Sequence, residues 1–571
     1  MAPPQTVHQR LDSWKEIAGY LRRDVRTVQA WEKKEGLPVH RHAHSARASV
    51  YAYAAELDAW LKDRRVTTDP PAKPDVPDAP EPAVRRRRPP YLIAGAVVAG
   101  GLVLVAFGAW RQATGPRPPF TLAVLPFESL SADSSDALVA DGLTDDLITE
   151  LGRSNQIAVI SRRSVAQFKG THVPLRQVAG KLNANLVLEG TIAHAGKTVR
   201  ITAQLVNAAT DHCLWAQSYE RDSVNVLSLQ DEVTGAVSTA VLERLTGHGM
   251  AAERAVRLVD PDVRLAYLTG RLFMSKRDEP GLTRAVVYFR QALQGDSTYG
   301  PAYAGLADCY NLLGTFGYLP EKQAFLAARA AALQAIRFDP RSAEAYNSLA
   351  FERYRYDWDF AGATKTFQYA IQLNPSYATA HQWYGEYLGD LHRADEAIAE
   401  SRRAVELDPL SAIARSDLGL VYLHVGRYAD ATAELNRVIA LYPDFALAHS
   451  YLAGVYVETG RLDEARVEEG RAAQANDEGL AIEDAWAAGR TDEVRTRTDA
   501  LARQAGAGRF NYISLAHLYS RLGDQESAMA ALERSYQQHE WMLVTLKVDP
   551  YFARMRTNPR FQDLIRRIGI P

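Results

Sequence analysis

Residues 375–409 read PSYATAHQWYGEYLGDLHRADEAIAESRRAVELDP, and this stretch decides the fold of the C-terminal half of the chain. Its apolar and small residues recur at helical spacing in two runs, which is typical of a pair of packed helices. Prolines mark the ends of successive units at Pro340, Pro375, Pro409 and Pro443, with separations of 35, 34 and 34 residues. A fixed period of this length predicts a stack of similar helix pairs.

The 34-residue period is that of the tetratricopeptide repeat, whose helix pairs stack into an α-solenoid. Small residues recur in register and would let the two helices of each pair pack closely. They are Ala350, Gly385, Gly419 and Ala453 in the first helices, and Ala363, Ala397, Ala431 and Ala465 in the second helices.

We expect the array to occupy residues 261–571 and to bind a protein or peptide. The aromatic residues Tyr346, Trp383 and Tyr384 are candidates for a binding groove, but we interpret most of them as core packing. The remaining parts are earlier units near 263–297 and 301–340, a degenerate helical stretch at 477–508, a looser unit at 509–538 and a polar-faced cap at 548–571.

Residues 118–247 have a different pattern, in which β-branched strands alternate with helices. FTLAVLPFESL at 120–130 begins with a strand, ALVADGLTDDLITEL at 137–151 has helical spacing, and the stretch up to Tyr219 predicts a hairpin and further strands. This order favours an α/β domain. Asp141, Asp145 and Asp146 form an acidic patch without a histidine or nucleophile, so we interpret them as structural.

These residues resemble the N-terminal domain of TolB and the related FlgO-type domain. The phrases that carry the resemblance are LAVLPFESLS, ADGLTDDLITEL, VISRRSV, ANLVLEGTI and VRITAQLVNAATDHCLWAQSYERD. The resemblance implies a binding or signalling role rather than catalysis.

An uncharged segment, YLIAGAVVAGGLVLVAFGAW, runs from Tyr91 to Trp110 and precedes the α/β region. Twenty helical residues span about 30 Å, the thickness of a hydrocarbon core, so the segment predicts a single transmembrane helix. Its two terminal aromatic residues suit the headgroup region. Four arginines at 85–88 place the N-terminus inside, which predicts a single-pass protein of a bacterial inner membrane with a periplasmic C-terminal region.

Residues 1–65 predict a small winged helix-turn-helix domain. Ser13 and Glu16 have the spacing of a capping box, and a second helix is expected from Val25 to Glu35. The alternating stretch from Val39 to Tyr53 predicts a β-hairpin wing, and a last helix is expected near 54–62. Residues 66–90 are rich in proline, alanine and aspartate, which predicts a disordered linker.

The run LDSWKEIAGYLRRDVRTVQAWEKKEGLPVHRH, residues 11–42, resembles the winged helix-turn-helix of MerR and excisionase-like proteins. This resemblance implies DNA contacts by Arg26, Thr27, Gln29 and Lys33 on the second helix, and by Arg41, His42 and Arg47 on the wing. Arg22 departs from the family pattern, which often has a glycine in this turn, and an arginine there is costly if its φ is positive. The order of domains resembles that of CadC-like membrane-anchored one-component regulators.

The whole chain has 571 residues and a formal net charge of -2, so overall charge indicates no particular partner. Cys213 and Cys309 lie in no metal-binding spacing, and we interpret both as buried thiols, although one bridge is formally allowed. We find no phosphate loop, catalytic triad, metal cluster or cyclase domain, so we predict no enzyme, no cofactor and no metal site.

The sequence therefore predicts a multidomain, membrane-anchored transcriptional regulator. Its N-terminal domain would bind DNA, and its external region would sense or bind a partner. Signalling through one span would require either altered dimerisation, in a homodimer, or altered helix packing. The alternative is an envelope scaffold whose N-terminal domain binds protein rather than DNA.

Overall fold

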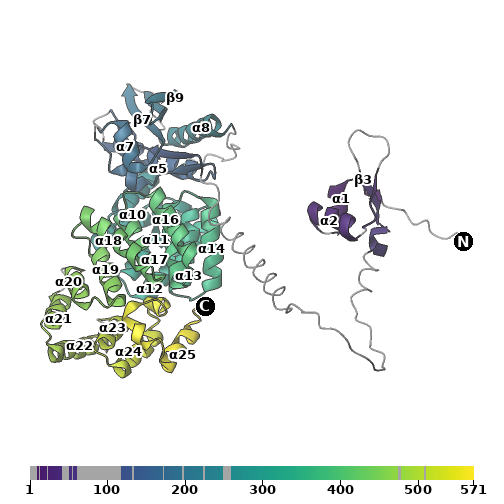
Figure 1. Ribbon diagram of the computed structural model, residues 1–571. Helices are drawn as coiled ribbons and strands as arrows, with labels where there is room; N and C mark the ends of the chain where they lie inside the picture. The colour runs from purple at the N-terminus through teal and green to yellow at the C-terminus, as the bar shows by residue number, and fades with distance from the viewer. Residues whose placement is uncertain are drawn as a thin grey trace, which may run out of the picture. The chain divides into compact units, whose positions relative to one another are not determined.

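The computed structural model describes the folded parts of the chain and leaves the predicted linker and the predicted span at 91–110, with Tyr91 and Trp110, outside the described residues. The described residues are 10–11, 13–21, 23–35, 37–41, 50–54, 56–60, 118–130, 134–171, 173–195, 198–222, 226–247, 259–472, 477–506 and 510–571. Within these ranges no helix is long and apolar enough to cross a membrane. The chain divides into two compact units, Met1–Ala96 and Val97–Pro571 (Figure 1).

The N-terminal unit packs two helices against a small sheet. Helix α1 (Trp14–Leu21) and helix α2 (Val25–Glu35) accompany strands β1 (Arg10–Leu11), β2 (His40–Arg41) and β3 (Val50–Tyr53). Strand β3 lies centrally and pairs antiparallel with both others. Apolar residues that include Ile17, Val28 and Leu57 form one buried core, so this unit has an apolar interior of its own.

Local sequence explains where both helices begin. The Ser13 hydroxyl accepts a hydrogen bond from the backbone N–H of Glu16 over 3.2 Å, in agreement with the expected cap. Asp24 does the same for α2, because it accepts the N–H of Thr27 over 2.9 Å and the Thr27 hydroxyl over 2.6 Å. Such caps satisfy N–H groups that have no partner within a helix.

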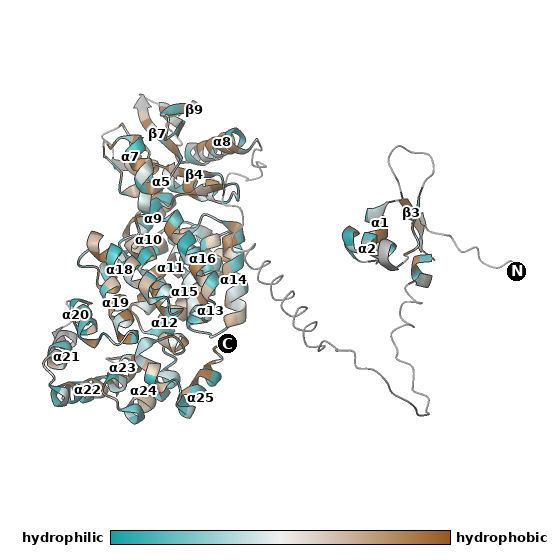
Figure 2. Ribbon diagram, viewed as in Figure 1, coloured by the Kyte–Doolittle hydropathy of each residue, from teal (hydrophilic) through white to brown (hydrophobic). Residues whose placement is uncertain are grey.

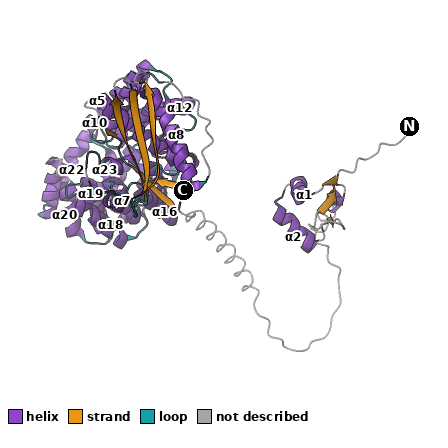
Figure 3. Cartoon of the chain, turned by 90° about the horizontal axis from the view of Figure 1, so that it is seen from above, coloured by secondary structure: helices purple, strands orange, loops and turns teal. Residues whose placement is uncertain are grey.

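The second unit begins with an α/β domain built on one mixed sheet, whose strands are seen from above in Figure 3. The strand order is β6-β4-β7-β8-β9, with β5 beside β7. Strands β4, β6 and β5 run parallel to their neighbours, while β7, β8 and β9 form an antiparallel meander. The bounds are β4 Phe120–Val124, β5 Glu128–Ser129, β6 Ile157–Val159, β7 Leu186–Ala195, β8 Thr198–Asn207 and β9 His212–Asp222.

Helices cover both faces of this sheet. Leu122 and Val124 point into a core shared with α5 (Ser134–Gly152) and α8 (Val226–Thr246). Ala123, between them in sequence, points to the opposite face and packs with residues of α6 (Arg162–Ala166) and α7 (Leu175–Leu182). The alternation follows from the two-residue period of a strand.

A solenoid of eight helix pairs follows in the described residues, and in Figure 2 its helices carry polar and apolar residues side by side. The pairs are α9 (Pro261–Met274) with α10 (Glu279–Gly295), α11 (Gly300–Thr315) with α12 (Glu321–Phe338), α13 (Ala343–Arg355) with α14 (Phe360–Leu373), α15 (Ala378–Asp390) with α16 (Ala394–Leu407), α17 (Ala412–His424) with α18 (Tyr428–Leu441), α19 (Ala446–Glu458) with α20 (Leu462–Ala472), α21 (Asp477–Ala487) with α22 (Thr491–Gly506), and α23 (Tyr512–Arg521) with α24 (Gln525–Gln538).

The eight small repeat residues lie at the contacts between paired helices. The six alanines among them are at most 2% exposed. A Cβ atom added to Gly419 would lie 2.6 Å from Leu435 Cγ, and one added to Gly385 would lie 2.9 Å from the backbone nitrogen of Ser401. At these two positions, a side chain larger than that of glycine would therefore push the paired helices apart.

Two expectations about details were wrong. Cys309 is buried, but Cys213 is exposed, because it faces outward on the edge strand β9. The C-terminal segment is not merely a polar-faced cap. The 3₁₀-helices η2 (Trp541–Thr545) and η3 (Pro550–Met555) bury apolar residues such as Phe552 in the core of the array, and only helix α25 (Pro559–Ile568) has the expected polar face.

Candidate functional sites

The predicted DNA-contacting residues lie only partly within the described residues. Arg26 is exposed on α2, and Gln29, one turn later on the same helix, is half-buried. Thr27 is half-buried, and its hydroxyl already donates to Asp24. Lys33 and Arg41 belong to α2 and β2, but their side chains lie outside the described residues, as do His42, Arg47 and Arg22.

The wing strand β3 and the adjoining strand β2 carry a group of aromatic side chains. The rings of His40 and Tyr51 are stacked with centroids 5.2 Å apart, and the Tyr51 ring meets Tyr53 edge-on at 5.8 Å. His40 Nε2 lies 2.7 Å from a carboxylate oxygen of Glu56. These contacts fix the base of the predicted hairpin against the residues that follow it.

In the second unit, the α/β domain is joined to the array by a buried hydrogen-bond cluster. Asp408, at the α16–α17 turn, accepts hydrogen bonds from the hydroxyls of Ser161 and Ser164, each over 2.6 Å. The Ser164 oxygen in turn accepts the backbone N–H of Leu410 over 3.0 Å. We call Ser161, Ser164 and Asp408 the junction cluster. It shows that the array packs directly on the α/β domain.

The acidic residues that we predicted to be structural form ion pairs, some of them with the first repeat. Asp141 pairs with Lys169 over 2.6 Å, and Asp146 pairs with Arg264 of α9. Asp145 is 5% exposed, and Arg271 and Arg162 lie 3.2 Å and 3.3 Å from its carboxylate. Burial opposes its ionisation, yet Arg271, Arg162 and Arg264 together hold the pKa of Asp145 below its usual value.

A cleft of about 1180 Å³ opens between the α/β domain and the first repeats. Its walls come from α5, β9 and α8 on one side and from α9, α11 and the start of α13 on the other. The lining contains eight acidic residues and four arginines, with no histidine, cysteine or lysine among the described residues that form it. Such a lining of charged and hydroxyl groups is suited to binding polar molecules.

Several polar groups in the cleft are only partly satisfied. The hydroxyls of Tyr219 and of the fully buried Ser238 have no hydrogen-bond partner among the described residues. Burial raises the pKa of Asp308 to about 6, although its carboxylate accepts a hydrogen bond from Ser348. Burial also raises the pKa of Tyr267 to about 12. Because buried polar groups are usually paired, the hydroxyls of Tyr219 and Ser238 are groups of the cleft that have hydrogen-bonding capacity left.

The array contains a recurring clasp that sequence analysis missed. His381 contacts the Glu400 carboxylate over 2.6 Å and the Pro375 carbonyl over 3.0 Å. The same arrangement recurs 34 residues later in Arg415, Glu434 and Pro409, and again in His449, Glu468 and Pro443. The available signal was a histidine or arginine and a glutamate that recur with the period of the prolines.

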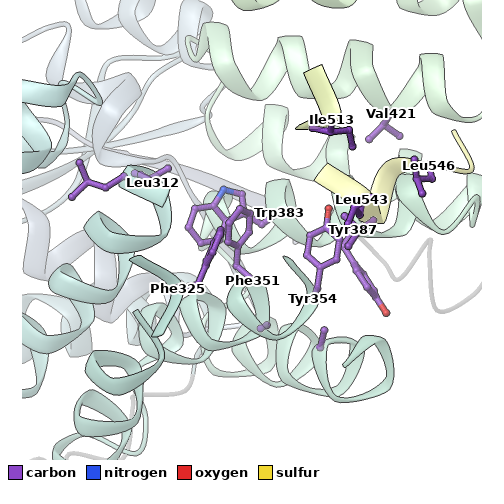
Figure 4. Packing of buried hydrophobic residues seen from close by; sticks show 14 of the residues in the cluster. Leu312, Phe325, Phe351, Tyr354, Trp383, Tyr387, Val421, Ile513, Leu543 and Leu546 are labelled. Carbon is purple, nitrogen blue, oxygen red and sulfur yellow. The ribbon is translucent and has the colours of Figure 1, made fainter. Parts of the chain in front are cut away.

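The aromatic residues considered for a groove are mainly packing residues, as expected. Trp383 and Tyr384 are 4% and 3% exposed and belong to the core of the array. In Figure 4 the Trp383 ring lies beside Phe351, and their ring centroids are 4.3 Å apart. Tyr346 is half-buried and meets the exposed Tyr369 edge-on at 4.7 Å.

Comparison with protein families assigns two parts of the second unit. Residues 119–236 match the second domain of HilA/YgeH-like transcriptional regulators. Residues 385–438, 416–481 and 511–537 match models of the tetratricopeptide repeat. The chain therefore combines a regulator-type α/β domain with a tetratricopeptide-repeat array.

A curated relative shares part of this chain. The putative adenylate cyclase 3 of Rhizobium meliloti (strain 1021) is 35% identical over 147 residues, which is 26% of this chain. The chain spans about a quarter of the length of that relative.

Solved structures are similar only in part. A human IFIT1 dimer with PPP-AAAA has 16% identity and a TM-score of 0.33, with 55% of this chain and 81% of that chain covered. YrrB, a TPR protein with an unusual peptide-binding site, has 24% identity and a TM-score of 0.23, covering 34% of this chain and 90% of the other. TolB from Acinetobacter baumannii has 18% identity and a TM-score of 0.17, covering 23% and 29%. The TolB, MerR and CadC resemblances stay predictions.

Proposed function

We propose that this protein is a membrane-anchored transcriptional regulator with a partner-binding region. The observation that carries the proposal is the match of residues 119–236 to a domain of transcriptional regulators, in a chain that also has a helix pair with a small antiparallel sheet at its N-terminus. The repeats supply a scaffold for a protein partner, since arrays of this type present extended surfaces.

The N-terminal unit is the proposed DNA-binding part. Helix α2 is the recognition helix, with Arg26 and Gln29 reaching the bases or phosphates and β2–β3 forming the wing. Arginine and glutamine are suited to this role because both can form paired hydrogen bonds with base edges in the major groove. Lys33, Arg41, His42 and Arg47 are assigned to the same surface by resemblance, whereas Thr27 serves first as part of the α2 cap.

The proposed topology places residues 1–90 in the cytoplasm, the span at 91–110 in an inner membrane and the remainder in the periplasm. The support is the four-arginine block before the uncharged segment and the basic bias of that flank. A signal then passes through changed packing or dimerisation of the span, because one helix alone has no partner to move against.

The test is DNA binding by the full chain in detergent micelles and by residues 1–66, which have their own buried core. Genomic fragments, including the region upstream of its own gene, are titrated across a salt series. Specific binding that persists at about 150 mM salt and is lost in Arg26→Ala and Gln29→Ala supports the regulator. Ala59→Ser, a change at an exposed residue outside α2, is the control.

The alternative function is an envelope scaffold whose N-terminal unit binds protein. Absence of DNA binding by both forms of the protein, or binding that salt erases on every fragment equally, would favour this alternative. A search for proteins retained by the N-terminal unit would then identify the partner.

A further inference from the structure

The face of the array formed by its first helices is covered by the chain's own C-terminal segment. We call the side of α13, α15, α17 and α19 that meets this segment the inner face. Helix η2 contacts α13, and η3 contacts α19 and α23. In Figure 4, pieces of the C-terminal ribbon lie among the helices that carry Tyr354, Tyr387 and Val421.

The beginning of the segment is held by directional contacts. The backbone N–H of Trp541 donates to the Glu321 carboxylate over 2.7 Å, and the Arg355 guanidinium lies over the Trp541 ring at 4.1 Å from its centroid. The His539 ring stacks on Trp358 with centroids 3.9 Å apart. A cation over an indole face is a favourable arrangement, particularly when it is desolvated.

Apolar anchors hold the rest of the segment. Leu543 and Leu546 are fully buried and belong to the same cluster as Tyr387 and Val421. Further along, Pro550 lies against Gly454 of α19, where an added Cβ atom would be 3.3 Å from the proline ring. Peptides that bind in grooves often do so through spaced apolar anchor residues of this kind.

The polar fit beneath this segment is incomplete. Arg355 is 1% exposed and donates through Nη2 to Glu386, but its Nε and Nη1 atoms have no hydrogen-bond partner among the described residues. The same is true of Glu352 Oε2 and of Trp358 Nε1. A buried donor or acceptor without a partner is destabilising, so these atoms remain available to hydrogen-bond a different segment bound at the inner face.

We propose that the inner face is a recognition groove occupied by the chain's own residues Trp541–Met555, and that a protein partner enters by presenting a segment of the same pattern in their place. The competing segment carries an aromatic residue over Arg355, two leucine-like anchors behind it and carbonyl groups that accept from Arg355. This inference rests on the proposed role of the array in binding a protein partner.

The test uses the full chain in detergent micelles and a fluorescein-labelled peptide with the sequence of residues 538–556. Wild-type protein is compared with Trp541→Ala and with Leu546→Ala, which both weaken the segment and leave the array side of the groove unchanged. Leu441→Ala, at a residue 64% exposed on α18, is the matched control. Fluorescence anisotropy reports peptide binding, and hydrogen exchange reports the protection of residues 541–555.

We expect both weakened variants to bind the peptide at least tenfold more tightly than wild-type protein and the control, with faster exchange in residues 541–555. A peptide in which Trp541 and Leu543 are replaced by alanine should not bind. Faster exchange without peptide binding overturns the proposal, and so does unfolding of the array in both variants, since the segment would then be an inseparable part of the core. DNA binding by the N-terminal unit is measured separately, so failure here is distinguishable from failure of the proposed function.

Discussion

The backbone N–H of Trp541 donates to the carboxylate of Glu321 over 2.7 Å, although 220 residues separate the two partners. Glu321 begins α12, and Trp541 begins η2, so this bond ties the second repeat to the C-terminal segment.

Stability should depend on pH through Glu321. Burial raises its pKa from the usual 4.5 to about 7. The folded chain therefore binds this proton more tightly than the unfolded chain, so the contribution is full below about pH 4.5 and is lost as the pH rises towards 7. We expect the thermal midpoint of wild-type protein to fall between pH 6 and pH 8 more than that of Glu321→Gln. An equal fall in both proteins would contradict this assignment.

The repeated clasp predicts an asymmetry between two substitutions at one position. His449→Ala leaves Glu468 Oε2 and the Pro443 carbonyl without the side chain that contacts both, although Arg471 still donates to Glu468 Oε1, and should lower the free energy of unfolding by about 1–3 kcal/mol. His449→Arg should be much milder, because Arg415 holds the equivalent place one repeat earlier. Urea unfolding followed by circular dichroism measures both, and equal losses would show that the clasp does not depend on a nitrogen donor at this position.

The junction cluster predicts that the α/β domain can be loosened from the array. Asp408→Ala removes the acceptor for Ser161 and Ser164 and should cost about 1–3 kcal/mol of the coupling between the two parts. We expect a broader or two-step unfolding curve and faster proteolysis near residue 161. Asp339→Ala is the control, since Asp339 caps the corresponding turn two repeats earlier through Arg341. The same change in both variants would rule out a specific role for Asp408.

In the N-terminal unit, Asp24 should contribute to stability and Arg26 to DNA binding. Asp24→Ala removes the cap of α2 and should lower the thermal midpoint of this unit, whereas Arg26→Ala should leave the midpoint unchanged and weaken DNA binding. The Thr27 hydrogen bonds hold the pKa of Asp24 below its usual value, so the cap should weaken as the pH falls through that range. Melting and DNA titration of the two variants test the separation, and a lower midpoint in Arg26→Ala would contradict it.

The repeats were predictable because their signals are local and recur with the prolines. Small residues such as Ala397 and Gly419 indicate close helix packing, and the residues that they pack against lie only one or two helices away along the chain. The contact between Ser164 and Asp408 spans 244 residues and involves ordinary polar side chains, so no local pattern indicates it. The inward path of residues 541–555 was missed for a similar reason, because short 3₁₀ turns lack the regular spacing by which helices are recognised.

The α/β domain contacts the array at three places that are far apart along the chain. Asp146 meets Arg264 in the first repeat, the backbone N–H of Val159 donates to Ser376 over 3.1 Å, and Ser164 meets Asp408. A repeat array can normally bend or extend along its length, because each unit contacts only its neighbours. Here the α/β domain contacts the array at Arg264, Ser376 and Asp408, so we expect the stretch of repeats between these residues to bend or extend less freely than the repeats that follow it.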